Sequence, residues 1–157
     1  MIYIKKSPTA DTRTCDFSKV SKETLLASSH QHIQDVGVAM AHFAILLCNQ
    51  AENHDHDKIS DIDGFHHDFL TGFKETTWWD NHRKVNRHHL LDADGVPADV
   101  NLIDVLDMIA DCVMAGMARS GSVYTLNIKP EVLQAAFENT VSLLKANVTV
   151  EDSNGIV

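Results

Sequence analysis

Hydrophobic residues recur at helical spacing along most of the chain. From about residue 21, apolar side chains follow an i, i+3, i+4 pattern, which places them on one face of an α-helix. The first such segment ends near residue 49, and we expect it to be a buried helix whose inner face carries Ile33, Val36, Met40, Phe43 and Leu47. Further helices are expected around residues 65–73, 76–91, 100–119 and 129–148, which are separated by turns that contain Gly or Pro.

This pattern predicts an all-α, single-domain helical fold with a short extended segment at the N-terminus. The expected boundaries are an N-terminal extension at residues 1–20, a helical domain at 21–150 and a C-terminal tail at 151–157. A chain of 157 residues is long enough to bury a core within one domain. The helix after Pro130 would suit either that core or the interface of a homo-oligomer.

Composition narrows the range of partners. Hydrophobic residues make up 44% and charged residues 22%, as in ordinary globular proteins. A formal net charge of −9 argues against an extended nucleic-acid surface, which needs a basic face. A small phosphorylated substrate stays open, because bound metal ions can reverse the local field.

The spacing of the cysteines and the hydropathy of the chain indicate the cellular compartment in which we expect the protein. The three cysteines include no C-x-x-C pair, which excludes a thiolate zinc finger and is typical of a reducing compartment. The longest apolar run, residues 36–48, is interrupted by His42 and is too short to cross a bilayer. No stretch resembles a signal peptide, so we expect a cytoplasmic protein without membrane contact.

Histidine and aspartate carry the candidate chemistry. All ten histidines fall within residues 30–89, and they are dispersed rather than contiguous as in a tag. In the segment 102–118 the only charged residues are Asp104, Asp107 and Asp111, which fall within a narrow arc of the predicted helix. Asp104 fits a helix cap together with Asn101, but Asp107 and Asp111 have no such explanation. A solvated acidic face and metal ligation by Asp107 or Asp111 are equally compatible with this pattern.

The stretch HDHD at residues 54–57 contains two His-Asp pairs. If a helix begins there and buries Ile59 and Ile62, Asp55 shares that buried face. Asp57 would then lie about 200° away around the helix. Its side chain would face either solvent or the outer side of the metal ligands, where it could support them. The first pair is therefore the expected metal-binding pair, provided that the segment is helical.

These residues resemble the HD-domain superfamily of metal-dependent phosphohydrolases, which combine a His on one helix, a His-Asp pair on a later helix and a distant Asp. A closer similarity is to a family of bacterial and phage proteins with an H-D-x-S-K element, a tryptophan-rich helix with H-x-x-x-N-x-H-H, and a hydrophobic helix with a central Asp. The match covers roughly residues 30–120, and its three elements here are HDHDK (54–58), WWDNHRKVNRHH (78–89) and MIADCVMAG (108–116). Two positions depart from these patterns. Asp57 replaces the Ser, and Lys58 stands where nucleotide-cleaving HD enzymes often carry an acid.

The resemblance implies an HD-type helical bundle, a metal site and a phosphohydrolase activity. One divalent ion (Mn, Co, Fe, Zn or Mg) would be held by His32, His54, Asp55 and Asp111. The substrate would be a nucleotide or a similar small phosphate ester, attacked by a metal-activated water. The implied catalytic residues are Lys58 and His82, which would complement phosphate charge, and Asp63, which would transfer a proton. Trp78 or Trp79 could stack on a base, although a tryptophan in the core is the simpler interpretation.

A second polar group leaves several functions open. It would supply either a second metal or a phosphate site, or it is simply a basic helix end; its members are His82, Arg83, His88, His89 and Asp107. Two metals would also suit an HD-type di-iron oxygenase, which activates O₂. A third alternative is a non-catalytic, metal-stabilised module that binds a nucleotide or a host protein.

Overall fold

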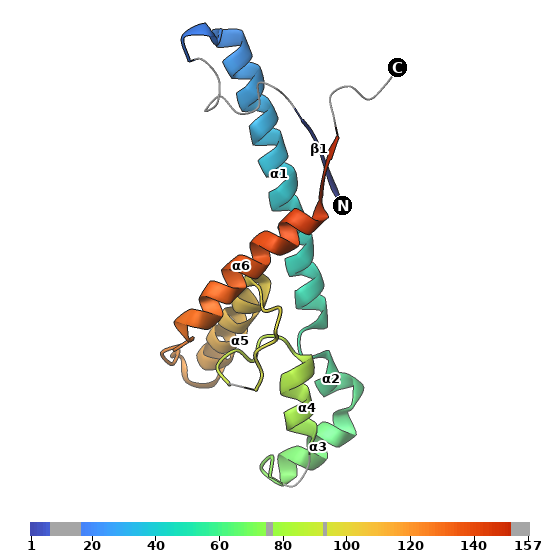
Figure 1. The fold of residues 1–157 in the computed structure, drawn as a ribbon. Helices are drawn as coiled ribbons and strands as arrows, with labels where there is room; N and C mark the ends of the chain where they lie inside the picture. The colour runs from blue at the N-terminus through green and yellow to red at the C-terminus, as the bar shows by residue number, and fades with distance from the viewer. Residues whose placement is uncertain (7–16, 75–76, 93, 152–157) are drawn as a thin grey trace. The chain divides into compact units, whose positions relative to one another are not determined.

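The computed structural model describes residues 1–6, 17–74, 77–92 and 94–151. Much of the predicted N-terminal extension, nearly all of the predicted tail, and Cys15 therefore lie outside the described residues. The elements, in chain order, are β1 (Ile2–Lys5), the short 3₁₀ helix η1 (Phe17–Lys19), α1 (Lys22–Asn53), α2 (His56–Ser60), α3 (Ile62–Leu70), α4 (Trp78–Val85), α5 (Leu102–Ser120), α6 (Pro130–Asn147) and β2 (Val148–Glu151) (Figure 1).

The described chain is mostly helical, which confirms the predicted all-α class. It divides into two compact units: the first contains residues 1–45 and 143–157, and the second contains residues 46–142. In the first unit β1 and β2 pair in parallel, with Ile2 opposite Val148 (Figure 1). The extended N-terminal segment was predicted, whereas β2 was not, because four residues are too few to show an alternating pattern.

The core of the second unit lies between α5, α6 and the segment that precedes α5. Its buried apolar side chains are Leu90, Val100, Val105, Met108, Val132 and Ala136. Two polar contacts fix the start of α5 against α6. The Leu102 amide donates to Thr140 Oγ1 (2.8 Å), and Asn139 Nδ2 donates to the carbonyl of Val100 (2.9 Å). These contacts hold the α5 residues that follow, including the three aspartates, in a defined position.

The predicted burial of the apolar stripe on α1 is wrong. Ile33 is 67% exposed, Met40 is 61% exposed, and α1 itself continues to Asn53. On α5, Leu106 and Ile109 are also exposed, while the neighbouring Val105 and Met108 are buried. Helical spacing shows which side chains share a face, but it does not show whether another element covers that face.

The helix expected from residue 54 is also different. A turn at residues 54–55 separates α1 from α2, and α2 begins only at His56. Ile59 and Ile62 are 76% and 57% exposed, so they do not mark a buried face. The selection of the first His-Asp pair must therefore rest on other contacts, described below. Among the described residues, no helix is both long and apolar enough to span a membrane.

One buried carboxylate links the loop after α4 to the start of α5. Asp104 is 1% exposed and accepts two hydrogen bonds from Arg87, of 2.8 Å from Nε and 2.9 Å from Nη2. It also accepts from the amide of Asn101, whose own side chain accepts from the Ile103 amide, so that the two side chains form a capping box. The predicted capping role of Asp104 is thus confirmed.

We predict that Arg87→Leu lowers the free energy of unfolding by about 2 to 3 kcal/mol, because it leaves a buried carboxylate without its cation. Asp99→Asn is the control, since Asp99 pairs with the same arginine but its side chain is 79% exposed; the expected loss is below about 0.5 kcal/mol. Urea unfolding of the three proteins gives the comparison. Equal losses would show that burial of Asp104 is not what makes the pair matter.

Candidate metal centre

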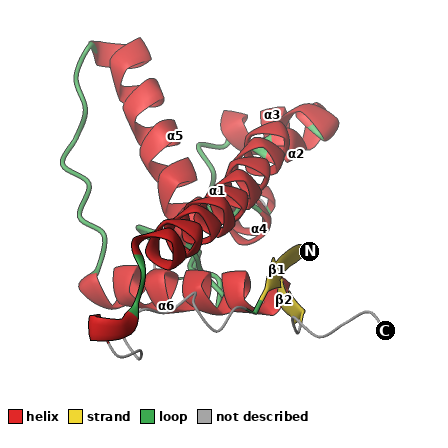
Figure 2. Ribbon diagram, turned by 90° about the horizontal axis from the view of Figure 1, so that it is seen from above, coloured by secondary structure: helices red, strands yellow, loops and turns green. Residues whose placement is uncertain are grey.

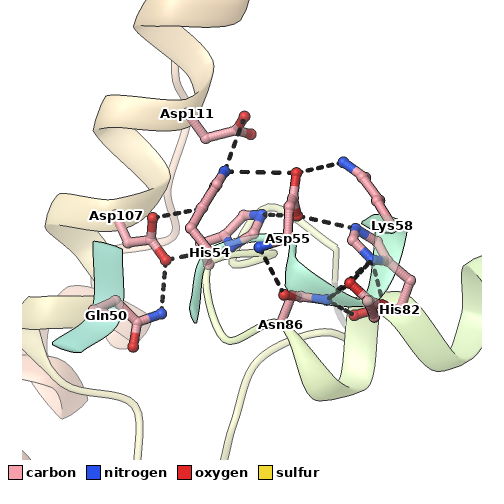
Figure 3. Close-up of polar contacts among 10 residues, drawn as sticks. Gln50, His54, Asp55, Lys58, His82, Asn86, Asp107 and Asp111 are labelled. Atoms are coloured by element: carbon pink, nitrogen blue, oxygen red, sulfur yellow. Dashed lines mark hydrogen bonds and ion pairs between the residues drawn. The ribbon is translucent and has the colours of Figure 1, made fainter. Parts of the chain in front are cut away.

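The turn between α1 and α2 presents His54 and Asp55 side by side. Asp55 has a left-handed backbone (φ 54°, ψ 21°), a conformation that Asp tolerates better than most residues. Its amide donates to Asn86 Oδ1 (3.2 Å), and its carboxylate pairs with Lys58. Figure 3 shows the turn between the aspartates of α5 on one side and His82 on the other.

Asp107 orients two of the imidazoles. One of its oxygens forms a 2.8 Å hydrogen bond with His54 Nδ1, and the other lies 3.3 Å from His88 Nδ1, at poorer alignment. Gln50, in the last turn of α1, donates to the same carboxylate (2.7 Å; Figure 3). Burial alone would raise the pKa of Asp107, but the hydrogen bonds from His88 and Gln50 and the nearby imidazoles lower it overall. A carboxylate that holds Nδ1 leaves Nε2 directed at a metal, as in many metalloproteins.

The Nε2 atoms of these two histidines face Asp55. His54 Nε2 lies 3.5 Å from Asp55 Oδ2, and His88 Nε2 lies 3.6 Å from Asp55 Oδ1. Asp111 Oδ1 lies 3.9 Å from His54 Nε2. Ligand atoms that bind one ion at roughly 2.0 to 2.2 Å sit about 3 to 4 Å from one another. The first group, His54, Asp55 and His88, therefore has the spacing of a metal site, and Asp111 lies beside its His54.

A second group shares Asp55. His82 is fully buried, and Asp57 accepts at its Nδ1 (2.8 Å), so that His82 Nε2 lies 3.4 Å from Asp55 Oδ1. Asn86 donates to Asp57 (2.9 Å) and fixes that carboxylate in turn. Ligand atoms of Asp55, His82 and His89 lie within 4.8 Å of one another. The second His-Asp pair thus contributes Asp57 as a support for His82.

Four buried polar atoms in these groups have no hydrogen-bond partner: Asp55 Oδ1, His82 Nε2, His88 Nδ1 and His89 Nε2. Each such atom costs about 1 to 3 kcal/mol, and native proteins contain few of them without a reason. His88 Nδ1 faces Asp107 at 3.3 Å, whereas the other three atoms belong to one set of converging ligands, so a bound cation would satisfy those three together.

Protonation also favours metal binding at the second group. Burial lowers the pKa of His82, and the hydrogen bond and charge of Asp57 offset only part of that effect. Burial, reinforced by the charges of His88 and His82, lowers the pKa of His89 to about 4. Both rings are therefore neutral at pH 7, the form in which histidine binds metals. For His88, burial acts in the same direction but is outweighed by Asp107, and its pKa is raised.

Three of the predicted site residues, His32, Asp63 and Arg83, do not join the two groups. His32 belongs to the first unit, where its side chain is exposed on α1, and its role as a ligand stays a prediction. Asp63 is exposed in the first turn of α3 and makes no hydrogen bond or ion pair with the two groups. Arg83 is held by Asp80 (2.8 Å) and Asp94 (2.7 Å), so its guanidinium is already paired.

The two tryptophans contact His82. The ring centroid of Trp78 lies 5.2 Å from that of His82 and the centroid of Trp79 lies 4.8 Å away, with both pairs stacked. Phe65 packs on Trp78 and Phe73 packs on Trp79. This arrangement supports the interpretation of both tryptophans as packing residues around His82, in preference to base stacking.

The predicted set omitted Gln50, Asp57 and Asn86 as site residues. Gln50, in the last turn of α1, stands four residues before His54, but that spacing carries no chemical signal of its own. Asn86 is part of the H-x-x-x-N-x-H-H element, which was the available clue.

In comparisons with known proteins, no family model, no curated protein and no solved structure matched the chain.

We predict that the metal-free protein loses stability as the pH falls from about 6.5 to about 4. A histidine with a lowered folded-state pKa is protonated first in the unfolded chain, so acid favours unfolding across that window. His89→Gln should flatten this pH dependence, whereas His56→Gln, at an exposed position, should not. Urea midpoints measured in a chelator at several pH values provide the test. Parallel curves for wild type and His89→Gln would contradict the buried neutral histidine.

Proposed function

We propose that the chain is a divalent-metal-dependent hydrolase of small phosphate esters, nucleotides among them. The observation that supports this most directly is the Asp55 carboxylate, which is shared by two groups of side chains with the spacing to hold a metal ion and which retains an unsatisfied buried oxygen. A hydrolase of this class needs such a centre, because a bound divalent ion polarises a phosphoryl oxygen and lowers the pKa of a bound water.

The residues of the second unit would have different roles at this metal centre. His54, His88 and Asp111 would complete one ion site with Asp55, and His82 and His89 would complete a second. Asp107 and Asp57 would keep the imidazoles of His54, His88 and His82 in the tautomer that presents Nε2. His88 would therefore stand in the place that the family resemblance gives to His32.

Lys58 would bind the substrate phosphate. Its ammonium pairs with Asp55 Oδ2, and it lies 5.8 Å from the centroid of the Trp79 ring. Once cations neutralise Asp55, the ammonium would be free to pair with a phosphoryl oxygen a few ångströms away. The similarity to the family with an H-D-x-S-K element agrees with a lysine at this position, although nucleotide-cleaving HD enzymes often carry an acid there; this similarity rests on the sequence motifs alone.

We predict that the protein as purified binds at least one divalent ion per chain, and that His54→Ala or Asp55→Ala weakens that binding by more than 100-fold. Asp57→Asn should weaken it about 10- to 100-fold, because it frees Nδ1 of His82. His56→Ala is the matched control in the same tetrapeptide, and its side chain is exposed. Elemental analysis and metal titration give the values. Equal losses in all four variants would mean that the wrong pair has been selected.

The activity itself is tested by phosphate release from a panel of nucleotides and simple phosphate esters, with Mn²⁺ or Co²⁺ added under anaerobic conditions. We expect metal-dependent hydrolysis that falls at least 100-fold in Asp55→Ala and about tenfold in Lys58→Gln. Hydrolysis that is unaffected by a chelator would overturn the proposal.

A second candidate follows from the same shared carboxylate. Two ions bridged by Asp55, with several histidine ligands, would also suit a di-iron oxygenase. Two irons per chain together with O₂ uptake, and no anaerobic phosphate release, would favour it. Tight nucleotide binding without turnover would instead favour the non-catalytic, metal-stabilised module.

A further inference from the structure

A pocket of about 320 Å³ opens next to Asp111, along the second half of α5. Its other wall is the segment that leaves α5 and runs toward α6, which is the long loop in Figure 2. Leu91, Ala115 and Leu126 provide apolar surface, and the exposed side chains of Arg119 and Tyr124 also line the pocket. This volume is at the lower end of the range for small-molecule sites, which is roughly 300 to 1,000 Å³.

Two glycines shape this pocket. Gly121 ends α5 in the left-handed conformation (φ 70°), so the chain turns back along the helix. A Cβ at Gly116 would lie only 2.6 Å from the carbonyl oxygen of Ser122, so this position admits no side chain while the loop stays in place. Ser120 Oγ hydrogen-bonds to the carbonyl of Gly116 (3.2 Å) and to that of Ser122 (3.3 Å). These contacts hold the segment after α5 in place as one wall of the pocket.

Arg119 differs from the other described arginines. Arg83 and Arg87 are each bound by two or more carboxylates. Arg119 has neither an ion pair nor a hydrogen bond with any described residue, although the chain as a whole is strongly acidic. It is also the only basic residue of α5. An unpaired guanidinium in a pocket presents a planar fork of donors that matches a carboxylate.

The two polar ends of the pocket are separated by eight residues of one helix, which corresponds to roughly 12 Å along its axis. At one end, Asp111 belongs to the candidate metal centre, where a phosphate would bind. At the other end is the guanidinium, with apolar side chains between. A ligand that reaches both ends of the pocket would carry a phosphate at one end, a flat or apolar middle, and a carboxylate at the other end.

We propose that this pocket binds the organic part of the substrate and that Arg119 selects phosphate esters that carry a carboxylate at the far end. The inference rests on the proposed function and deepens it by naming the substrate class. Arg119 is a specificity-determining residue, and Gly116 keeps the pocket open by allowing the loop to pack against α5.

The test uses two phosphonates that cannot be hydrolysed, benzylphosphonate and 4-(phosphonomethyl)benzoate, which differ only in the carboxylate. Isothermal titration calorimetry on the metal-loaded full chain should show the carboxylated compound binding at least tenfold more tightly. Arg119→Gln should abolish this preference, and Arg119→Lys should restore part of it. Lys129→Gln removes the same charge at an exposed position outside the pocket and should keep the preference.

Gly116→Ala should weaken both compounds at least tenfold while the metal content stays that of the wild type. Equal affinities for the two phosphonates, binding of neither, or a preference that survives Arg119→Gln would overturn the inference. These outcomes are separate from failure of the proposed function, because calorimetry requires no turnover. If the protein shows the Arg119-dependent preference but releases no phosphate from any ester, the inference about the pocket stands and the proposed hydrolase activity is wrong.

Discussion

A half-buried carboxylate among imidazoles requires positive charge nearby, and Asp55 places this requirement on the residues around it in the second unit. The left-handed turn between α1 and α2 places it there, with its amide held by Asn86. Lys58 covers one of its oxygens, while the other is buried without a hydrogen bond and faces His82 and His88. These groups come from α2, α4 and the loop after α4. All three segments therefore contact the same charged side chain.

The supporting carboxylates decide which atoms the imidazoles offer. Asp107 serves His54 and His88 together, and Asp57 serves His82. Each support is itself held by an amide side chain, Gln50 in one case and Asn86 in the other. This two-layer arrangement restricts ring rotation before any ligand binds, so less conformational entropy is lost on binding.

Much of this could be predicted from the sequence, because helical periodicity and residue chemistry are local properties. The helical class follows from spacing alone, and the aspartates of α5 were singled out by the same periodicity. The predicted second polar group is divided in the structure, because His88 and Asp107 lie with His54 while His82 and His89 lie together. The partners of each group could not be predicted, because they depend on how helices pack. Asp57 as the support of His82, and Gln50 as the support of Asp107, are contacts between residues 25 and 57 positions apart.

The errors have a common physical origin. The helix expected at residue 54 required Ile59 and Ile62 to be buried, but a turn intervenes and both are exposed. The selection of Asp55 stays a prediction, and the turn geometry now supports it in place of the expected helix. The exposed apolar residues of α1 show the same limitation, since a pattern along one helix contains no information about what lies against it.

The close approach at Gly116 has a consequence for how the protein can diversify. Along α5, the residues that would hold metal precede this glycine, and the residues that would select a substrate follow it. Insertions or exchanges in the loop after Gly121 can therefore alter the pocket without moving Asp107 or Asp111. Relatives that share the metal ligands but differ in this loop would form a set with one chemistry and many substrates, and their divergence would be concentrated in a single short segment.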